Sequence, residues 1–469
     1  MRQLNGIDTS FLNLETPTQQ GHVAGVVILD PSTAPDGWGY DAIRKLIERR
    51  IHMLPPFRRR LVTVPFEVDQ PYWIEDPDFD LDFHLRHIAV PPPGGDEQLA
   101  ALVARIHERP LDRSRPLWEL YVIEGLENGR VAVLTKLHHA AVDGVSGAEI
   151  LTILLDPTPE GRLIAPPARE WAPDKIPSQL SLLARSGITA ALQPAKAFRL
   201  GVDLVKAVPA LKPLTTVPAL LGIGRDKDEV LSRPTLVAPH SILNEPITAH
   251  RRWAFGSIAL DDVKDVKNRY EVTVNDVVIS ISAGAVRRWL LDRDELPERS
   301  LQAMVPISIR TDDNGDMGNN VSAMIAPIGT HIEDPVERLE FVHETMNIAK
   351  DQHSATPATL LQDFAQFTPP AIAARAARWV FRNGRAGKVT PFNLVISNVP
   401  GPHFPLYLAG AQLLGHYPVS AIIDGAGLNI TLHSYLGQLC FGLVADRDLA
   451  PDLWNMMDYL RDELAVLQD

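Results

Sequence analysis

The first third of the chain alternates between the hydrophobic repeats of strands and those of helices. A nearly continuous apolar run predicts a buried strand, and apolar positions spaced three or four residues apart predict helices. A turn at Asn128-Gly129 joins two short apolar runs, and Ser146 is placed to cap a helix that follows. The expected strands are 21–30, 118–124 and 131–137, and the expected helices are 40–54 and 97–108.

Regular patterns return near residue 250 and continue to the end. Strands interleaved with helices in both halves of a chain are typical of α/β layers, so we predict an α/β fold. We expect strands at 251–259, 302–309, 320–329, 392–398, 411–419, 428–434 and 438–444, and helices at 260–270, 275–292, 333–352, 369–382 and from 451 onward.

The middle of the chain differs from both halves. Residues 156–177 hold six prolines and read as a linker. Residues 176–225 are apolar and basic, with six Lys or Arg against one Asp, a local charge of +5. This segment is either a connection lying on the surface or a contact with a membrane or lipid droplet. We therefore expect subdomains at 1–175 and 241–469, joined by a connecting segment at 176–240.

Composition narrows the class of protein. The 469 residues carry a net charge of -13, which disfavours a general nucleic-acid binder. The single cysteine, Cys440, permits no disulfide within the chain and is best interpreted as a small buried residue. The N-terminus lacks the apolar core of a signal peptide, and no stretch approaches a spanning helix. We expect a cytoplasmic location, with peripheral contact to the inner face of the plasma membrane or to lipid droplets left open.

The run from His138 to Gly144 carries the candidate chemistry. Two histidines end a predicted strand, and Asp143 follows four residues after the second. Imidazole is the side chain best suited to accept a proton near neutral pH. Adjacent strand residues point to opposite faces, so only one of the two rings readily faces a cleft. The same alternation separates the rings and disfavours a metal site.

The motifs of several other enzyme classes are missing. The chain has no Gly-x-Ser-x-Gly elbow for a serine nucleophile, and Gly144-Val145-Ser146-Gly147 has a different spacing. It also has no glycine-rich phosphate loop. What remains is a general base without a protein nucleophile, which suits direct attack by a substrate hydroxyl or amine on an acyl group.

Several short motifs, taken together and in order, resemble the bacterial wax ester synthase/acyl-CoA:diacylglycerol acyltransferase family. This family lies within the HHxxxDG acyltransferase superfamily, and the resemblance covers nearly the whole chain. One departure is Leu243-Asn244-Glu245-Pro246-Ile247, where the family often has a glycine. The matching motifs are the opening from Leu4 to Asp8 with Phe11, Leu12 and Glu15, then Pro116-Leu117-Trp118, the run from His138 to Gly144, Asn275-Asp276-Val277-Val278, Pro306 to Arg310 with Gly318-Asn319, Ser397 to Pro402, and Gly427 to Gly437.

The resemblance implies roles for the residues of the HHxxxDG motif. His139 corresponds to the catalytic second histidine, the general base, and His138 then supports it. Asp143 is implied to orient the loop through an arginine, for which Arg310 is our candidate. Gly144 keeps the turn open.

No single motif identifies the residue that would donate a hydrogen bond to the oxyanion or position the acceptor substrate. Asn275 is our first candidate, and the alternative is that Asn275 caps the helix that begins at Asp276. Asp276 is interpreted as structural. Ser397 and Asn398 are second candidates, with a turn-stabilising pair as the alternative. Trp118 is interpreted as core packing, with substrate contact as the alternative.

For the whole molecule, the resemblance implies two chloramphenicol-acetyltransferase-like subdomains around a central tunnel. The implied reaction moves a long-chain acyl group from acyl-CoA to diacylglycerol or a long-chain alcohol, with both substrates bound together. The implied enzyme needs no cofactor and no metal, and acyl-CoA is a substrate. Two alternatives remain: a condensation-type acyltransferase that uses carrier proteins, and a weakly active protein of lipid-droplet surfaces. The pattern leaves the oligomeric state open.

Overall fold

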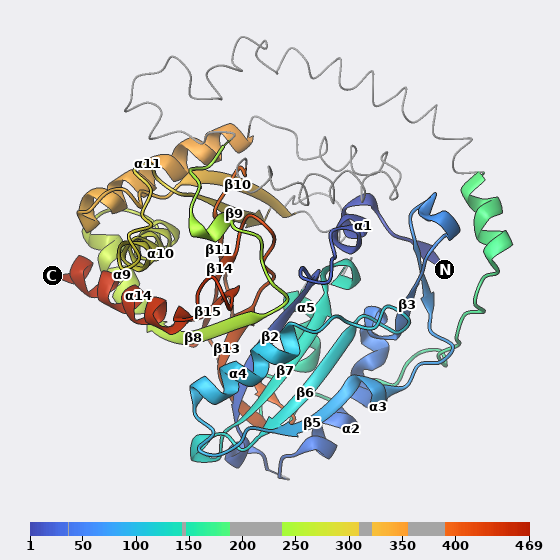
Figure 1. The fold of residues 1–469 in the computed structure, drawn as a ribbon. Coiled ribbons are helices and arrows are strands. Elements are labelled where there is room, and N and C mark those ends of the chain that lie inside the picture. The colour runs from blue at the N-terminus through green and yellow to red at the C-terminus, as the bar shows by residue number, and fades with distance from the viewer. Residues whose placement is uncertain (36, 143–146, 188–236, 309–320, 355–389) are drawn as a thin grey trace.

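Two six-stranded mixed sheets with packed helices, together with a small three-stranded sheet, make up the described structure (Figure 1). The computed structural model describes residues 1–35, 37–142, 147–187, 237–308, 321–354 and 390–469. The α/β prediction is confirmed by this arrangement. Of the predicted elements, the helix at 369–382 and the cap at Ser146 lie outside the described residues.

The first sheet has the order β12-β13-β2-β7-β6-β5. Its residues alternate between two apolar clusters, as a sheet covered on both faces requires. Val26 packs toward helix α4 (Asp96–His107), whereas Val27 packs toward α2 (Tyr40–Arg50). The strands are β12 (Tyr407–Leu408), β13 (Ala411–Val419), β2 (His22–Asp30), β7 (Val131–His138), β6 (Trp118–Glu124) and β5 (Leu85–Ala89), and the other helices of this half are α3 (Leu81–His84) and α5 (Gly147–Leu154).

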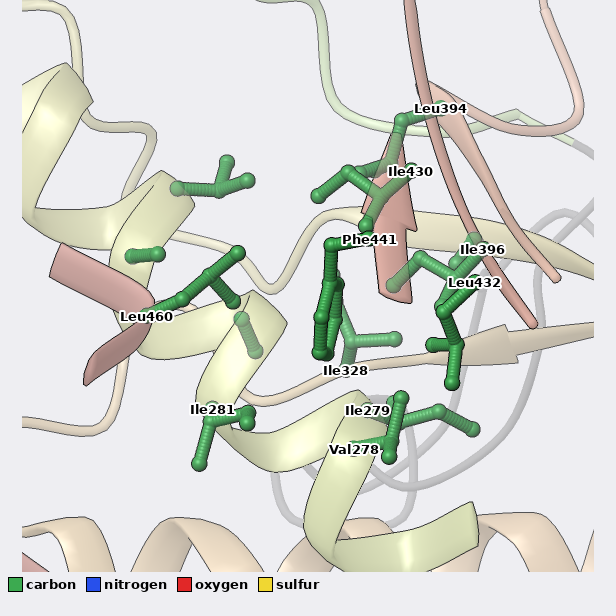
Figure 2. Close-up of a cluster of buried hydrophobic side chains, with 14 of the residues drawn as sticks. Val278, Ile279, Ile281, Ile328, Leu394, Ile396, Ile430, Leu432, Phe441 and Leu460 are labelled. Carbon is green, nitrogen blue, oxygen red and sulfur yellow. The ribbon is translucent and has the colours of Figure 1, made fainter. Parts of the chain in front are cut away.

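The second sheet has the order β10-β9-β11-β14-β15-β8 and one face covered by helices. Figure 2 shows Val278, Ile279 and Ile281 of α10 beside sheet residues such as Ile430 and Phe441. The strands are β8 (Arg251–Ala259), β9 (Gln302–Ser308), β10 (Val321–Pro327), β11 (Leu394–Val399), β14 (Leu428–Tyr435) and β15 (Gln438–Asp446), and the helices are α9 (Leu260–Arg269), α10 (Val274–Leu291), α11 (Pro335–Ser354) and α14 (Leu453–Gln468).

Strand β13 holds the two sheets together. It comes from the C-terminal part of the chain, yet it pairs antiparallel with β2 of the first sheet and packs against β15 of the second. The backbones come very close here, because a Cβ on Gly442 would lie 1.9 Å from the Pro418 carbonyl oxygen. Trp253 Nε1 also donates to that oxygen at 3.0 Å. The predicted subdomain boundaries stay a prediction, since the first sheet takes strands from both ends of the chain.

The small sheet has the order β1-β4-β3, from β1 (Arg2–Gln3), β4 (Tyr72–Glu75) and β3 (Arg59–Val62). Trp73 of β4 belongs to an apolar cluster with Ala140 and Ala141, which directly follow the two histidines. Helix α1 (Gly6–Asn13) packs on the same turn, and the Asn5 side chain caps this helix. The turn after His138 is therefore enclosed by the beginning of the chain and by the small sheet.

Where observed and predicted elements differ, local chemistry gives the reason. The predicted helix 40–54 ends at Arg50 and continues as a 3₁₀ turn, because Pro55 and Pro56 cannot extend it. The helix predicted from 275 begins at Val274, and Thr273 is its cap, so the alternative of Asn275 as the cap is wrong. Cys440 is buried, as predicted. No helix within the described ranges is both long and apolar enough to cross a membrane.

Candidate active site

Strand β7 ends at His138, and a 3₁₀ turn spans His139–Val142. The ring of His138 is buried, with 1% of the residue exposed. Its Nδ1 accepts a hydrogen bond from the Ala140 amide at 3.0 Å, and its Nε2 lies 3.1 Å from Glu15 Oε1. Because Nδ1 accepts, the ring proton lies on Nε2 and is donated to Glu15. His138 thus fixes the first bend of the turn that carries His139.

Glu15 holds His138 from the other side. Glu15 Oε1 also accepts from the Gly21 amide at 2.8 Å, and Oε2 pairs with Arg113 at 2.5 Å. Burial by itself would raise the pKa of Glu15. The hydrogen bond from His138, the Gly21 amide and the charge of Arg113 outweigh that effect and lower the pKa to about 2. Glu15 is therefore an ionised acceptor at neutral pH.

His139 occupies a different environment from its neighbour. Its backbone amide donates to the Gly21 carbonyl at 2.9 Å, so Gly21 anchors both Glu15 and the turn. Its half-buried ring stacks on Phe11, with the ring centroids 4.7 Å apart and the planes 15° from parallel. Burial, with a smaller contribution from His138, lowers the pKa of His139 to about 4. The imidazole is therefore neutral at pH 7, and one of its ring nitrogens can accept a proton.

A row of buried polar side chains continues behind the turn. His22, the cross-strand partner of His138, has Nε2 2.6 Å from the His107 carbonyl oxygen. Lys136 Nζ donates to the carbonyls of Ile106, at 2.9 Å, and of Arg109 at the end of α4. Burial, and to a smaller extent the charge of Lys136, keeps the pKa of His22 and of His107 well below the usual value. The row fixes the end of α4 against β2 and β7.

Trp118 lies in the core. It is 1% exposed, its Nε1 donates to the Phe57 carbonyl at 2.9 Å, and its ring stacks between Phe57 and His84. These contacts account for the residue as packing between β6, the 3₁₀ turn Pro55–Arg58 and α3. Contact with a substrate stays a prediction.

The Asn275-Asp276 pair lies in the first turn of α10. Asp276 is fully buried, and its Oδ2 accepts from the Thr273 amide at 3.0 Å and faces His343 Nδ1 at 2.7 Å. His343, on α11, has Nε2 3.2 Å from Asn347 Nδ2. Asn275 is half-buried beside this arrangement. His343 was not predicted, because it lies 67 residues from Asp276 and belongs to no motif.

Ser397 and Asn398 point to opposite faces of the second sheet. In the parallel pairing of β11 with β14, Ser397 lies beside Thr431 and Asn398 beside Leu432. Leu432 packs toward the helices (Figure 2). Its neighbour Asn398 is therefore on the helix face of the sheet. Thr431 Oγ1 instead accepts from Ser420 Oγ at 2.9 Å, at the junction with β13. Ser397 therefore faces the first sheet, and the two candidates cannot act as one pair.

The structure brings only part of the predicted site together. Among the described residues, no hydrogen bond joins His139 to Asn275, Ser397 or Asn398, and no cluster of three or more metal-binding side chains occurs. Asp143, Gly144 and Arg310 lie outside the described residues, so their predicted ion pair and turn stay predictions. Arg113 was not predicted. Glu15 was noted only as a match to the family's opening, and neither side chain carries a local signal for its role.

Comparisons with known proteins cover the whole chain. A family model described as the wax ester synthase/diacylglycerol acyltransferase catalytic domain matches residues 4–278, and one described as the WS/DGAT C-terminal domain matches residues 317–468. The O-acyltransferase WSD of Acinetobacter baylyi is 35% identical over 479 aligned positions, which cover 100% of this chain and 97% of the relative.

Solved structures give the same picture. The wax ester synthase/diacylglycerol acyltransferase of Marinobacter aquaeolei VT8 aligns with a TM-score of 0.70 and 33% identity, covering 99% of this chain and 98% of that one. The trichothecene 15-O-acetyltransferase of Fusarium sporotrichioides aligns with a TM-score of 0.58 at 12% identity, over 99% of this chain and 94% of that one. The second likeness shows a shared fold alone, and it agrees with the predicted acyltransferase architecture of two sheet-rich halves.

Proposed function

The chain belongs to the wax ester synthase/diacylglycerol acyltransferase family, and from that premise we propose that His139 is the general base of an acyl transfer from acyl-CoA. The enzyme is an O-acyltransferase. The acceptors are diacylglycerol, giving triacylglycerol, and long-chain alcohols, giving wax esters. The observation that carries the assignment of the base is the His139 side chain, a neutral, half-buried ring that stacks on Phe11 while the backbone amide is fixed by the Gly21 carbonyl.

The reaction follows from a base that has no protein nucleophile beside it. His139 removes the proton from the acceptor hydroxyl, and the oxygen attacks the thioester carbonyl to give a tetrahedral oxyanion. The carbon–sulfur bond then breaks, and His139 returns the proton to the leaving CoA thiolate. Both substrates are bound together, and no acyl-enzyme forms. A low pKa makes His139 a weaker base, but it keeps nearly all molecules in the reactive form.

The remaining roles extend the same proposal. Asn275 supplies a neutral amide to the oxyanion or acceptor, supported by its half-buried place beside the fixed Asp276. Ser397 is the second candidate because it faces the first sheet. Asp143 and Arg310 form the ion pair that orients the loop, and Gly144 permits its turn. The two substrates enter a tunnel between the sheets from opposite sides. The reaction requires neither cofactor nor metal.

The test uses purified full-length protein with radiolabelled palmitoyl-CoA and either dioleoylglycerol or hexadecanol. Wild type should form labelled neutral lipid, and His139→Ala should lower the rate about 10²–10⁴-fold, the usual contribution of a general base. His240→Ala, which removes an exposed histidine, is the matched control and should keep full activity. Neutral lipid formed at an unchanged rate by His139→Ala would rule out His139 as the base. No product from wild type with either acceptor would contradict the assigned substrates.

A further inference from the structure

The loop between β3 and β4 presents an aromatic side chain to solvent on an unfavourable backbone. Phe66 is 83% exposed and has φ 61°, and Glu67, the next residue, has φ 52°. Left-handed backbone is sterically unfavourable for residues that have a Cβ. Elsewhere among the described residues, no two consecutive non-glycine residues both have a positive φ. Burial of Phe66 within this chain does not explain why the loop adopts this conformation.

A second segment adds apolar side chains at the same place. Residues 179–187 form a helix whose Leu182 packs on Val64 and Tyr72, at the base of the loop. Figure 1 shows this helix beside the loop at the N-terminal side of the molecule. Leu180 of the helix is 79% exposed. Ile176, which precedes the helix, and Val68 in the loop are exposed as well.

The small sheet connects this surface with the turn that carries His139. Tyr72 faces Leu182, and its neighbour Trp73 packs with Ala140 and Ala141. A small cavity at this junction is lined by Arg2, Pro56, Arg59, Trp73 and Ala141. The exposed apolar side chains are therefore one strand away from the candidate active site.

We propose that Phe66, Val68, Ile176 and Leu180 form a lipid-contact face that inserts into the surface of a phospholipid bilayer. The choice of partner rests on the proposed function, because diacylglycerol and long-chain alcohols reside in membranes rather than in water. Lys175 is exposed and directly precedes Ile176, where its cation suits lipid headgroups beside inserted apolar side chains. Four side chains at a loop tip and a helix are few for a stable protein interface, which needs roughly 800 Å² per partner.

The first experiment measures flotation of full-length protein with phosphatidylcholine vesicles, without acyl-CoA. Phe66→Gly removes the ring and relieves the left-handed strain, so binding should fall about tenfold while the thermal midpoint holds or rises. Leu180→Ser should weaken binding in the same way. Val466→Ser is the matched control, since Val466 is also an exposed apolar residue but lies on α14. Phe66→Trp adds one tryptophan at the contact. Its fluorescence emission, taken as the difference from wild type, should shift to the blue when vesicles are added.

Two further measurements separate this proposal from the proposed function. Phe66→Gly should transfer acyl groups to dispersed hexanol at the wild-type rate, but more slowly to dioleoylglycerol in vesicles. Vesicle binding that is lost in Phe66→Gly supports the lipid-contact face even if wild type transfers no acyl group, in which case only the proposed function fails. Unchanged vesicle binding by Phe66→Gly overturns the proposal. The proposal is also overturned if 0.5 M salt abolishes the vesicle binding of wild type and of Phe66→Gly alike, because electrostatic attraction would then account for the binding.

Discussion

At the scale of single residues, two adjacent imidazoles differ in the contacts that their ring nitrogens make. Both ring nitrogens of His138 are engaged, one by the Ala140 amide and one by Glu15. His139 is held instead by its backbone amide and by the flat face of Phe11. A ring with both nitrogens engaged can position the chain but cannot accept a substrate proton. That difference supports the proposal that His139, and not His138, is the general base.

The lowered pKa of His139 predicts an unusual acid limit of activity. A base works only when unprotonated, so kcat/KM should fall with an apparent pKa near 4 rather than near the usual 6.5. The measurement is a pH profile from pH 8 to pH 4 in constant ionic strength. Aliquots returned to pH 7 check that any loss is reversible and does not reflect unfolding. An acid limb near pH 6.5 with intact protein would contradict the environment described for His139.

Glu15 should act through His138 and not on the substrate. Glu15→Gln keeps the size of the side chain but removes the charge that accepts from His138 and Gly21. A hydrogen bond to a charged group contributes about 1.5–3 kcal/mol, so kcat should fall about 10–100-fold. KM for both substrates should change little, because the Glu15 carboxylate is already engaged by His138, Gly21 and Arg113. Glu97→Gln, at an exposed acid on α4, is the control. A large change in KM with constant kcat would argue against a positioning role.

At the scale of elements, close approach of two backbones at β13 and β15 depends on one missing side chain. Gly442→Ala would place a Cβ 1.9 Å from the Pro418 carbonyl oxygen, which is backbone and cannot move aside. We expect a loss of about 3 kcal/mol or more in the free energy of unfolding, measured by urea denaturation. Gly187→Ala is the control, since no atom lies within 4 Å of the added Cβ. Equal stability of the two variants would show that the backbones at Gly442 and Pro418 can move apart at little cost in free energy.

Elements were predictable from the chain, whereas their partners were not. The apolar stretch of α10 located that helix to within a residue, because the stretch reflects burial along the element itself. Strand β13 was also predicted, but nothing in 411–419 indicates that it pairs with β2. The same holds for the contact of Glu15 with His138, across 123 residues, and for the opposite faces of Ser397 and Asn398. Such contacts depend on the three-dimensional arrangement and leave no local pattern.

At the scale of the whole molecule, buried neutral histidines make the fold sensitive to acid. Burial lowers the pKa of His84, His139 and His433 to about 4 and that of His107 to about 3, and it also lowers the pKa of His22 and His416 well below the usual value. In the unfolded chain these groups titrate near 6.5. Between pH 6.5 and about 4 the unfolded state therefore binds more protons than the folded state does.

Stability should fall as the pH drops from 6.5 toward 4, and about 1.4 kcal/mol per pH unit is the upper limit for the contribution of any one histidine. Glu15, whose folded pKa is about 2, loses its contribution below about pH 4.5 and acts in the same direction. The measurement is a series of urea midpoints from pH 7.5 to pH 4.5. His84→Phe should flatten the slope, and a midpoint that stays constant across the series would contradict the burial of these rings.

The pairing of β13 with β2 also constrains how the protein is made. On the ribosome β2 emerges early, and its neighbour β7 can pair with one side of it soon afterwards. The other edge of β2, with its run of valines and isoleucine, stays open until residue 419 has been synthesised, a delay on the order of a minute. An open apolar strand edge attracts other chains. A nascent chain of this enzyme is thus a client for chaperones that cover strand edges, and a fragment ending near residue 278 would expose that edge permanently.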